Sequence, residues 1–300
     1  MHKHGFVLCA LAFLFGVALA PVAANAQAFN ASDHEQRAYV EGNLFFLGYH
    51  EVGHMILDQV LDIDQQSDRL SSEEVADDIA TWLMLPDADE PEQDEYITAA
   101  IEGWSRSAGL DEGISQSPHY PDDATRAARI ACYLYGSNPN LYPELAELFS
   151  NSIASVDCGE EVEALHEDLI SWLGDHFVEP GTPPGERIQV TYEQAGPGLQ
   201  AARAFLMQSG VLEDAAEDIS QFVRLPNEVE LVAASCGAGA AEFRYSPSAR
   251  RITACYEAVD WLMKDASGEE HDLAVAAAER GDEMGSGGAR VPRRPRPPGR

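Results

Sequence analysis

The chain has 300 residues, of which 45% are hydrophobic, so it is long enough for one large or two small domains with a real core. Its 51 acidic residues against 19 basic ones give a formal net charge of -32 at pH 7. A surface of this charge repels nucleic acid and anionic lipid, which excludes both as general partners.

Residues 1–28 have the features of an export signal. Lys3 supplies a weakly basic start, the apolar stretch GFVLCALAFLFGVALA follows, and ANA or AQA ends the segment with small residues. This order is typical of a secretory signal peptide, here cut after Ala26 or Ala28. The stretch is short for a membrane span, and the sequence offers no other candidate span. We therefore expect an exported protein, either periplasmic or secreted.

The segment from about residue 33 to 60 is predicted to be a helix that binds a metal. Its apolar residues recur at spacings of three and four, and residues 32–35 have the pattern of a capping box headed by Ser32. Within it, His50, Glu51 and His54 match the zinc signature H-E-x-x-H. Both imidazoles lie on one face of a helix, and Glu51 can contact a water bound to the ion. A chance match is the alternative, but these polar residues in so apolar a helix are costly unless they are satisfied.

A third ligand is expected from the next helix, SSEEVADDIATWLMLP, because catalytic zinc has three protein ligands and an open position. This helix offers four acids near its start, namely Glu73, Glu74, Asp77 and Asp78. Ser71 and Glu74 fit a capping box, which would give Glu74 a backbone role.

On a helical wheel, Glu73 and Asp77 share a side with small residues that would let the histidine helix come close. We favour Glu73 as the ligand and keep Glu74 as the alternative. Asp58, one turn after His54, is a weak candidate for a residue that supports the ligands.

The remaining segments divide at the Pro/Gly stretch 178–186. Before it, helices are predicted within residues 94–109, 122–139, 142–153 and 160–177. After it, a strand is predicted at 187–194, helical structure at 198–226, and three strands at 228–236, 240–246 and 250–257, with a turn at Ser246-Pro247-Ser248. Beyond about residue 266 the chain is rich in Gly, Pro and Arg, which predicts disorder.

Four cysteines remain after removal of the signal peptide with Cys9. An even number in an exported protein favours two disulfides, and pairing by neighbourhood gives Cys132–Cys158 and Cys236–Cys255. A four-cysteine zinc site is the rival, but no C-x-x-C spacing occurs.

The separation of 19 residues between His54 and Glu73 resembles that of the gluzincin metallopeptidases. There, a glutamate of an E-x-x-x-D helix binds zinc and the aspartate orients the first histidine. This chain contains that pattern twice, as Glu73 with Asp77 and as Glu74 with Asp78. The resemblance thus implies that Asp77 is the partner of His50. Most of residues 38–264 resembles a bacterial family of metallopeptidases known mainly from its motifs, a domain of unknown function. The stretches that carry this resemblance are GNLFFLGYHEVGHMILD, EEVADDIAT, ACYLYGSNP and CGAGAAEFRYSPSARRITACYE.

This resemblance implies a zincin-type fold and peptidase activity. The chain departs from the family at residues 70–74, where the family's glycine and arginine are missing. Aligning Ala76-Asp77 with the family's Ala-Asp still places Glu73 on an acidic position.

The expected fold class is therefore α+β, with a mainly helical zincin-like core and a small antiparallel sheet from the C-terminal half. We expect a signal peptide at 1–28, a helical metal-binding region at 29–177, an α+β region at 178–265 that packs on it as one catalytic unit, and a disordered tail at 266–300.

The expected activity is zinc-dependent hydrolysis of a peptide or protein substrate, with one zinc ion and Glu51 as general base. Three residues are candidates to stabilise the oxyanion, namely Tyr256, His119 and Tyr120. A zinc hydrolase acting on other bonds is one alternative. The other is a cell-envelope binding module with a structural metal.

Overall fold

The computed structural model describes residues 30–31, 33–61, 72–86, 94–110, 123–153, 156–179, 181–185, 188–237 and 242–268. The signal peptide, His119 and Tyr120, and the tail from residue 269 lie outside these ranges. None of the helices within them is both long enough and apolar enough to cross a membrane.

The elements in chain order are α1 (His34–Gln59), α2 (Ser72–Met84), α3 (Asp94–Leu110), α4 (Asp123–Ser137), α5 (Pro143–Leu148), α6 (Ser150–Ile153), α7 (Cys158–Leu173), the 3-10 helix η3 (Gly174–His176), β1 (Gln189–Tyr192), α8 (Gln200–Ser209), α9 (Val211–Phe222), β2 (Glu230–Ala234), β3 (Phe243–Ser246), β4 (Arg251–Cys255) and α10 (Tyr256–Ser267). The expected α+β class is confirmed, with helices predominating and one four-stranded sheet.

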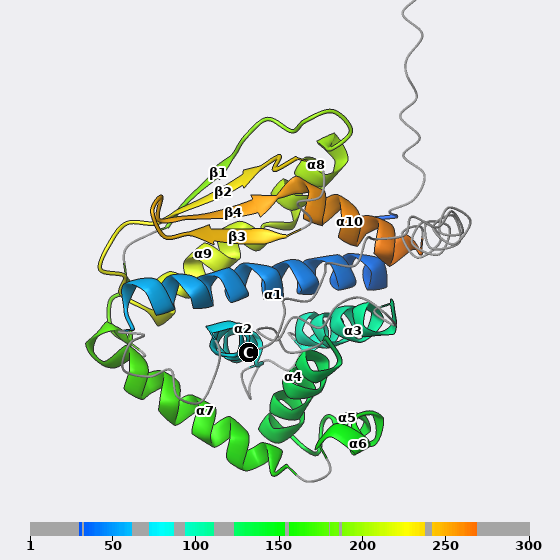
Figure 1. The fold of residues 1–300 in the computed structure, drawn as a ribbon, viewed down its shortest axis with the longest axis vertical. Helices are drawn as coiled ribbons and strands as arrows, with labels where there is room; N and C mark the ends of the chain where they lie inside the picture. The colour runs from blue at the N-terminus through cyan, green and yellow to red at the C-terminus, as the bar shows by residue number, and fades with distance from the viewer. Residues whose placement is uncertain are drawn as a thin grey trace, which may run out of the picture.

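Helix α1 runs through the middle of the molecule (Figure 1). It packs against α2 and α3 on one side and against β3, α9 and α10 on the other. Such a helix must be apolar around most of its circumference, which explains its long apolar run. Its N-cap is Asp33, whose side chain accepts hydrogen bonds from the backbone N–H groups of Glu35 and Gln36. The cap is therefore one residue later than the predicted Ser32.

The sheet is mixed, and the expectation of an antiparallel sheet is wrong. Its strand order is β1-β2-β4-β3, in which β1 pairs with β2 and β2 with β4 in parallel, and only β3 and β4 are antiparallel. Parallel neighbours need a long crossover connection, and α8 and α9 supply it between β1 and β2. Alternation along a strand reports which face is buried but not the direction of the neighbouring strand. Strand β3 is left at the edge of the sheet, next to α1.

Two other boundaries differ from the expected ones. The helical stretch after β1 divides into α8 and α9 at Gly210, whose φ of 77° lies in the left-handed region that glycine adopts easily. The last strand ends at Cys255, and Tyr256 begins α10. That helix continues to Ser267 and so overlaps the first residues of the predicted tail at 266–300.

Both expected cysteine pairs are joined. Cys132–Cys158 links α4 to the start of α7, with 5.1 Å between the Cα atoms. Cys236–Cys255 links the chain just after β2 to the end of β4, with 5.5 Å between the Cα atoms. Because β2 and β4 are adjacent parallel strands, the second disulfide ties their matching ends together rather than the two outer strands of a meander.

Helices α1 and α2 approach each other very closely at Gly53. A Cβ atom added there would lie 2.5 Å from the Cα and 2.9 Å from the Cβ of Ala76. The small residue inside the H-E-x-x-H motif and the alanine between Glu73 and Asp77 therefore let the two helices touch through their backbones. This contact brings the histidines and the acids together.

Gly53→Ala should consequently force the two helices apart. We expect it to lower the free energy of unfolding by about 1–3 kcal/mol, as overpacking does in a tight core. Gly48→Ala, on the same helix, is the matched control. The methyl group added there lies 4.0 Å from its nearest neighbour, Phe243, so this variant should be neutral or stabilised by up to about 1 kcal/mol. Urea unfolding with a chelator present measures both, and equal stabilities would contradict the packing argument.

Candidate metal centre

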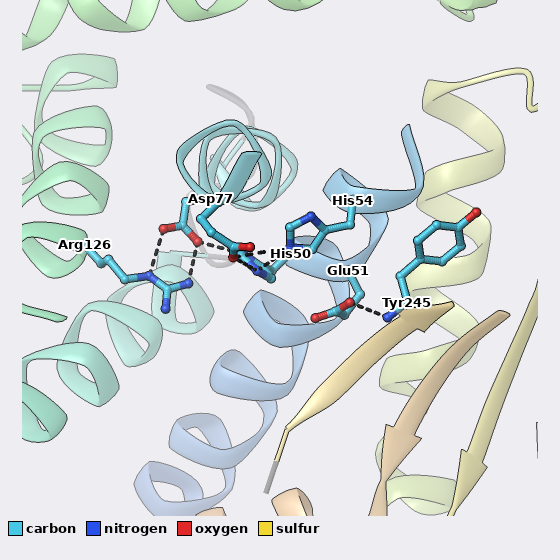
Figure 2. Close-up of polar contacts among 7 residues, drawn as sticks. His50, Glu51, His54, Asp77, Arg126 and Tyr245 are labelled. Carbon is cyan, nitrogen blue, oxygen red and sulfur yellow. Dashed lines mark hydrogen bonds and ion pairs between the residues drawn. The ribbon is translucent and has the colours of Figure 1, made fainter. Parts of the chain in front are cut away.

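Three side-chain atoms from α1 and α2 converge on one point (Figure 2). His50 Nε2 lies 3.1 Å from His54 Nε2 and 3.2 Å from Glu73 Oε2, and His54 Nε2 lies 3.4 Å from the same oxygen. The three atoms thus form a nearly equilateral triangle. One helical turn separates the two histidines on α1, and the close approach at Gly53 supplies the carboxylate from α2.

This triangle fits a tetrahedral metal ion. Zinc binds histidine nitrogen and carboxylate oxygen at about 2.0–2.1 Å, and two such ligands at the tetrahedral angle lie about 3.3 Å apart. The three measured separations match that value. Two neutral imidazoles and a carboxylate form one of the ligand sets that catalytic zinc uses, and this set leaves one position open. The residues present therefore fit zinc.

Asp77 fixes the orientation of the first histidine. Its Oδ1 lies 2.8 Å from His50 Nδ1, and its side chain is almost fully buried. A carboxylate that accepts this N–H directs the opposite nitrogen, Nε2, towards the metal position. Asp77 is itself bound by Arg126 of α4 through two hydrogen bonds. No motif or periodicity points to this arginine, because it lies 49 positions further along the chain.

The pKa values of His50, Glu73 and Asp77 are shifted because the three side chains lie close together. Burial lowers the pKa of His50, but hydrogen bonds to Asp77 and Glu73 outweigh it and raise the pKa to about 9. Burial raises the pKa of Glu73, but the two histidines lower it well below its usual range. The pKa of Asp77 is also lowered, because His50 and Arg126 outweigh its burial. Without a metal, the site therefore holds a protonated imidazole against two ionised carboxylates.

Glu51 lies between the metal position and the edge strand (Figure 2). One oxygen of its carboxylate and one ring nitrogen each of His50 and His54 all lie within 4.8 Å of one another. Its Oε2 accepts a hydrogen bond from the backbone N–H of Tyr245 on β3. Burial raises the pKa of Glu51, although the histidines and this hydrogen bond act in the opposite direction. A half-buried carboxylate of raised pKa beside a metal position suits proton transfer.

Tyr245 connects β3 to α1 at a second point. Its hydroxyl donates to Asp58 Oδ2 over 2.8 Å, two turns after Glu51 on α1. Asp58, the weaker of the two residues predicted to support the ligands, therefore binds Tyr245. The alternation of the sequence FRYS placed Tyr245 on a strand, but it did not show that this strand lies against the metal-binding helix.

These residues open onto a cleft of about 750 Å³. Its walls come from α1, α2, α3, α4 and β3, and they combine apolar side chains with charged ones. Leu47, Leu57 and Phe243 are among the apolar residues, and Asp58 and Arg126 are among the charged ones. A cleft of this volume can take a segment of peptide.

The other predicted site residues lie elsewhere. Glu74 is 3.8 Å from Arg129, and Asp78 accepts from Arg129 and Tyr133 on the far side of α2. The structure thus brings Glu73 and Asp77, not Glu74 and Asp78, to the histidines. Tyr256 is fully buried, donates to the carbonyl of Glu193, and does not line the cleft.

The sequence matches the model of a family described as "Putative metallopeptidase" over residues 18–169 and 192–282. Because these segments cover well over half of the chain, the protein belongs to this family. No curated protein and no solved structure matches it significantly. The family description agrees with the convergence of His50, His54 and Glu73 on a cleft.

The raised pKa of His50 predicts how the metal-free protein responds to pH. Its stabilising contribution is complete below the unfolded value of 6.5 and is lost as the pH rises through about 9. Glu73 and Asp77 have lowered pKa values, so their contributions to stability are present above their unfolded pKa values of 4.5 and 3.8. These contributions therefore stay constant as the pH rises from 6 to 9.5. The free energy of unfolding should thus fall by about 3 kcal/mol between pH 6 and pH 9.5.

Urea unfolding of chelator-treated protein at several pH values measures this change. In His50→Gln, the decline across the same window should be smaller, because the residue that titrates is missing. An equal decline in the two proteins would assign the pH dependence to other groups.

Proposed function

We propose that this protein is an exported zinc metallopeptidase with His50, His54 and Glu73 as metal ligands and Glu51 as general base. One observation carries the proposal: three donor atoms spaced as the face of a tetrahedron open onto a cleft beside Glu51. Membership of the metallopeptidase family supports it. A zinc ion in this position supplies a Lewis acid and lowers the pKa of a bound water towards about 7.

In the proposed reaction, Glu51 transfers the proton and Asp77 orients His50. Glu51 Oε2 is held by the Tyr245 N–H, and among the described residues Oε1 has no hydrogen-bond partner. Oε1 is thus the atom that takes the proton of the attacking water and delivers it to the leaving amine. Asp77 holds the His50 ring in place throughout, since its bond is to the opposite nitrogen.

Export is supported by independent features. The N-terminal sequence has the order of a signal peptide, and two disulfides occur among the described residues. Disulfides persist in oxidising compartments such as the periplasm or the extracellular space. We therefore propose a periplasmic or secreted enzyme that acts on peptide or protein substrates.

Glu51→Gln tests the catalytic role directly. The variant should keep about one zinc per chain but lose cleavage by on the order of 100- to 10 000-fold, because the amide cannot take a proton. His54→Ala should lose the metal itself. Metal analysis and a broad panel of peptides and esters measure both effects. Cleavage of esters but not peptides would indicate another hydrolase, and unchanged peptide cleavage by Glu51→Gln would refute the mechanism.

Glu73→Gln and Glu74→Gln form a matched pair for the third ligand. The two residues are adjacent on α2, but only Glu73 lies at hydrogen-bond distance from the histidines. Glu73→Gln should weaken zinc affinity by at least about 100-fold, more than is typical for groups behind the ligands. Glu74→Gln should bind zinc like the parent protein. Competition with a chromogenic chelator gives both constants, and the reverse order would transfer the ligand role to Glu74.

A further inference from the structure

Arg126 lies behind the proposed ligands and has no role in the function proposed above. Its Nε donates to Asp77 Oδ2 over 2.8 Å, and its Nη2 donates to Asp77 Oδ1 over 2.6 Å. This two-pronged geometry is stronger and more directional than a single hydrogen bond. Because Asp77 Oδ1 also meets His50 Nδ1, one buried carboxylate connects the guanidinium group of α4 to the imidazole of α1.

Arg126 is itself held in place by aromatic rings. Its guanidinium carbon lies 3.6 Å from the centre of the Trp104 ring on α3 and 5.9 Å from that of Phe46 on α1. Only 12% of its side chain is exposed. Stacking on aromatic faces restrains both the position and the plane of a guanidinium group. The arginine is therefore a fixed point contributed by α4, a helix that supplies no proposed ligand.

The pair of hydrogen bonds from Arg126 to Asp77, called the fork below, also restrains the orientation of His50. A carboxylate can turn about its terminal torsion, which is broad and weakly restrained. With His50 as its sole partner, Asp77 could turn and carry the imidazole with it. Two bonds to a fixed guanidinium set the plane of the carboxylate, and this plane sets the direction of His50 Nδ1 and hence of Nε2.

We propose that Arg126 is a positioning residue of the metal centre, which sets the zinc affinity through Asp77 and His50. This inference rests on the proposed function for the identity of the ligands. It adds α3 and α4 to the elements on which the metal site depends, although neither contains a ligand.

Arg126→Lys tests the proposal, because it keeps the charge but removes the fork. Arg129→Lys is the matched control. Arg129 also lies on α4 and binds a buried aspartate of α2, namely Asp78 over 2.7 Å, but that aspartate faces away from the histidines. Zinc dissociation constants of the full chain, measured by chelator competition, should be raised about 10- to 100-fold by Arg126→Lys and left near the parent value by Arg129→Lys.

A double-mutant cycle separates positioning from general damage. In the Asp77→Asn background, Arg126→Lys should cause little further loss of zinc affinity, because the group that it orients has already been changed. Independent structural effects would instead add. Arg126→Gln, which keeps one N–H donor group, replaces the lysine variant if that variant does not fold.

The outcomes distinguish this inference from the proposed function. Three outcomes would overturn the positioning role: parent-like zinc affinity in Arg126→Lys, equal losses of affinity in both arginine variants, or additive losses in the double-mutant cycle. None of these would affect the proposed function if the parent protein still cleaves peptides. Conversely, a parent protein that binds zinc in an Arg126-dependent way but cleaves no peptide would overturn the peptidase function alone.

Discussion

The contact between the backbones of α1 and α2 is the constraint on which the site depends. Each helix alone presents its polar residues one turn apart, and neither could surround an ion. Only when Gly53 meets Ala76 do two imidazoles and a carboxylate come within 3.1–3.4 Å of one another. A side chain at Gly53 would press against the backbone of Ala76 and so separate the two helices that carry the proposed ligands.

The close approach of α1 and α2 also buries charged side chains, and other groups must offset the cost of removing them from water. Asp77 is 4% exposed, and an ionised carboxylate at such a depth is very costly without partners. It has two, His50 and the fork of Arg126. The second aspartate of the same helix, Asp78, is satisfied in the same way by Arg129 and Tyr133. Helix α4 therefore supplies both arginines for two adjacent buried acids, one structural and one beside the histidines.

The sequence predicted the parts of the site that depend on local spacing. The histidines and Glu51 followed from a motif within one helix, and the helical wheel distinguished Glu73 and Asp77 from their neighbours, as the geometry has them. The two disulfides were predicted by pairing cysteines that are neighbours along the sequence. Arg126, Trp104 and Tyr245 were missed because they reach the site through tertiary packing, which leaves no period in the sequence. The parallel pairing of β2 with β4 was missed for the same reason, since strand direction depends on the crossover and not on alternation.

Helix α1 shows how this packing is kept in place along its length. Towards its start, the Asn43 amide donates to the carbonyls of Tyr39 and Ala99, and Tyr39 bonds to the buried Asp265 of α10. The N-terminal half of the helix is thereby tied to α3 and α10.

The C-terminal half of α1 contains His50 and His54 and is tied to the sheet edge through Glu51 and Asp58. A rigid helix transmits orientation along its axis, so the anchors at one end restrain the direction of the histidines at the other. The anchoring residues Tyr39, Asn43 and Asp58 therefore hold α1 in its orientation between α3, α10 and the edge of the sheet.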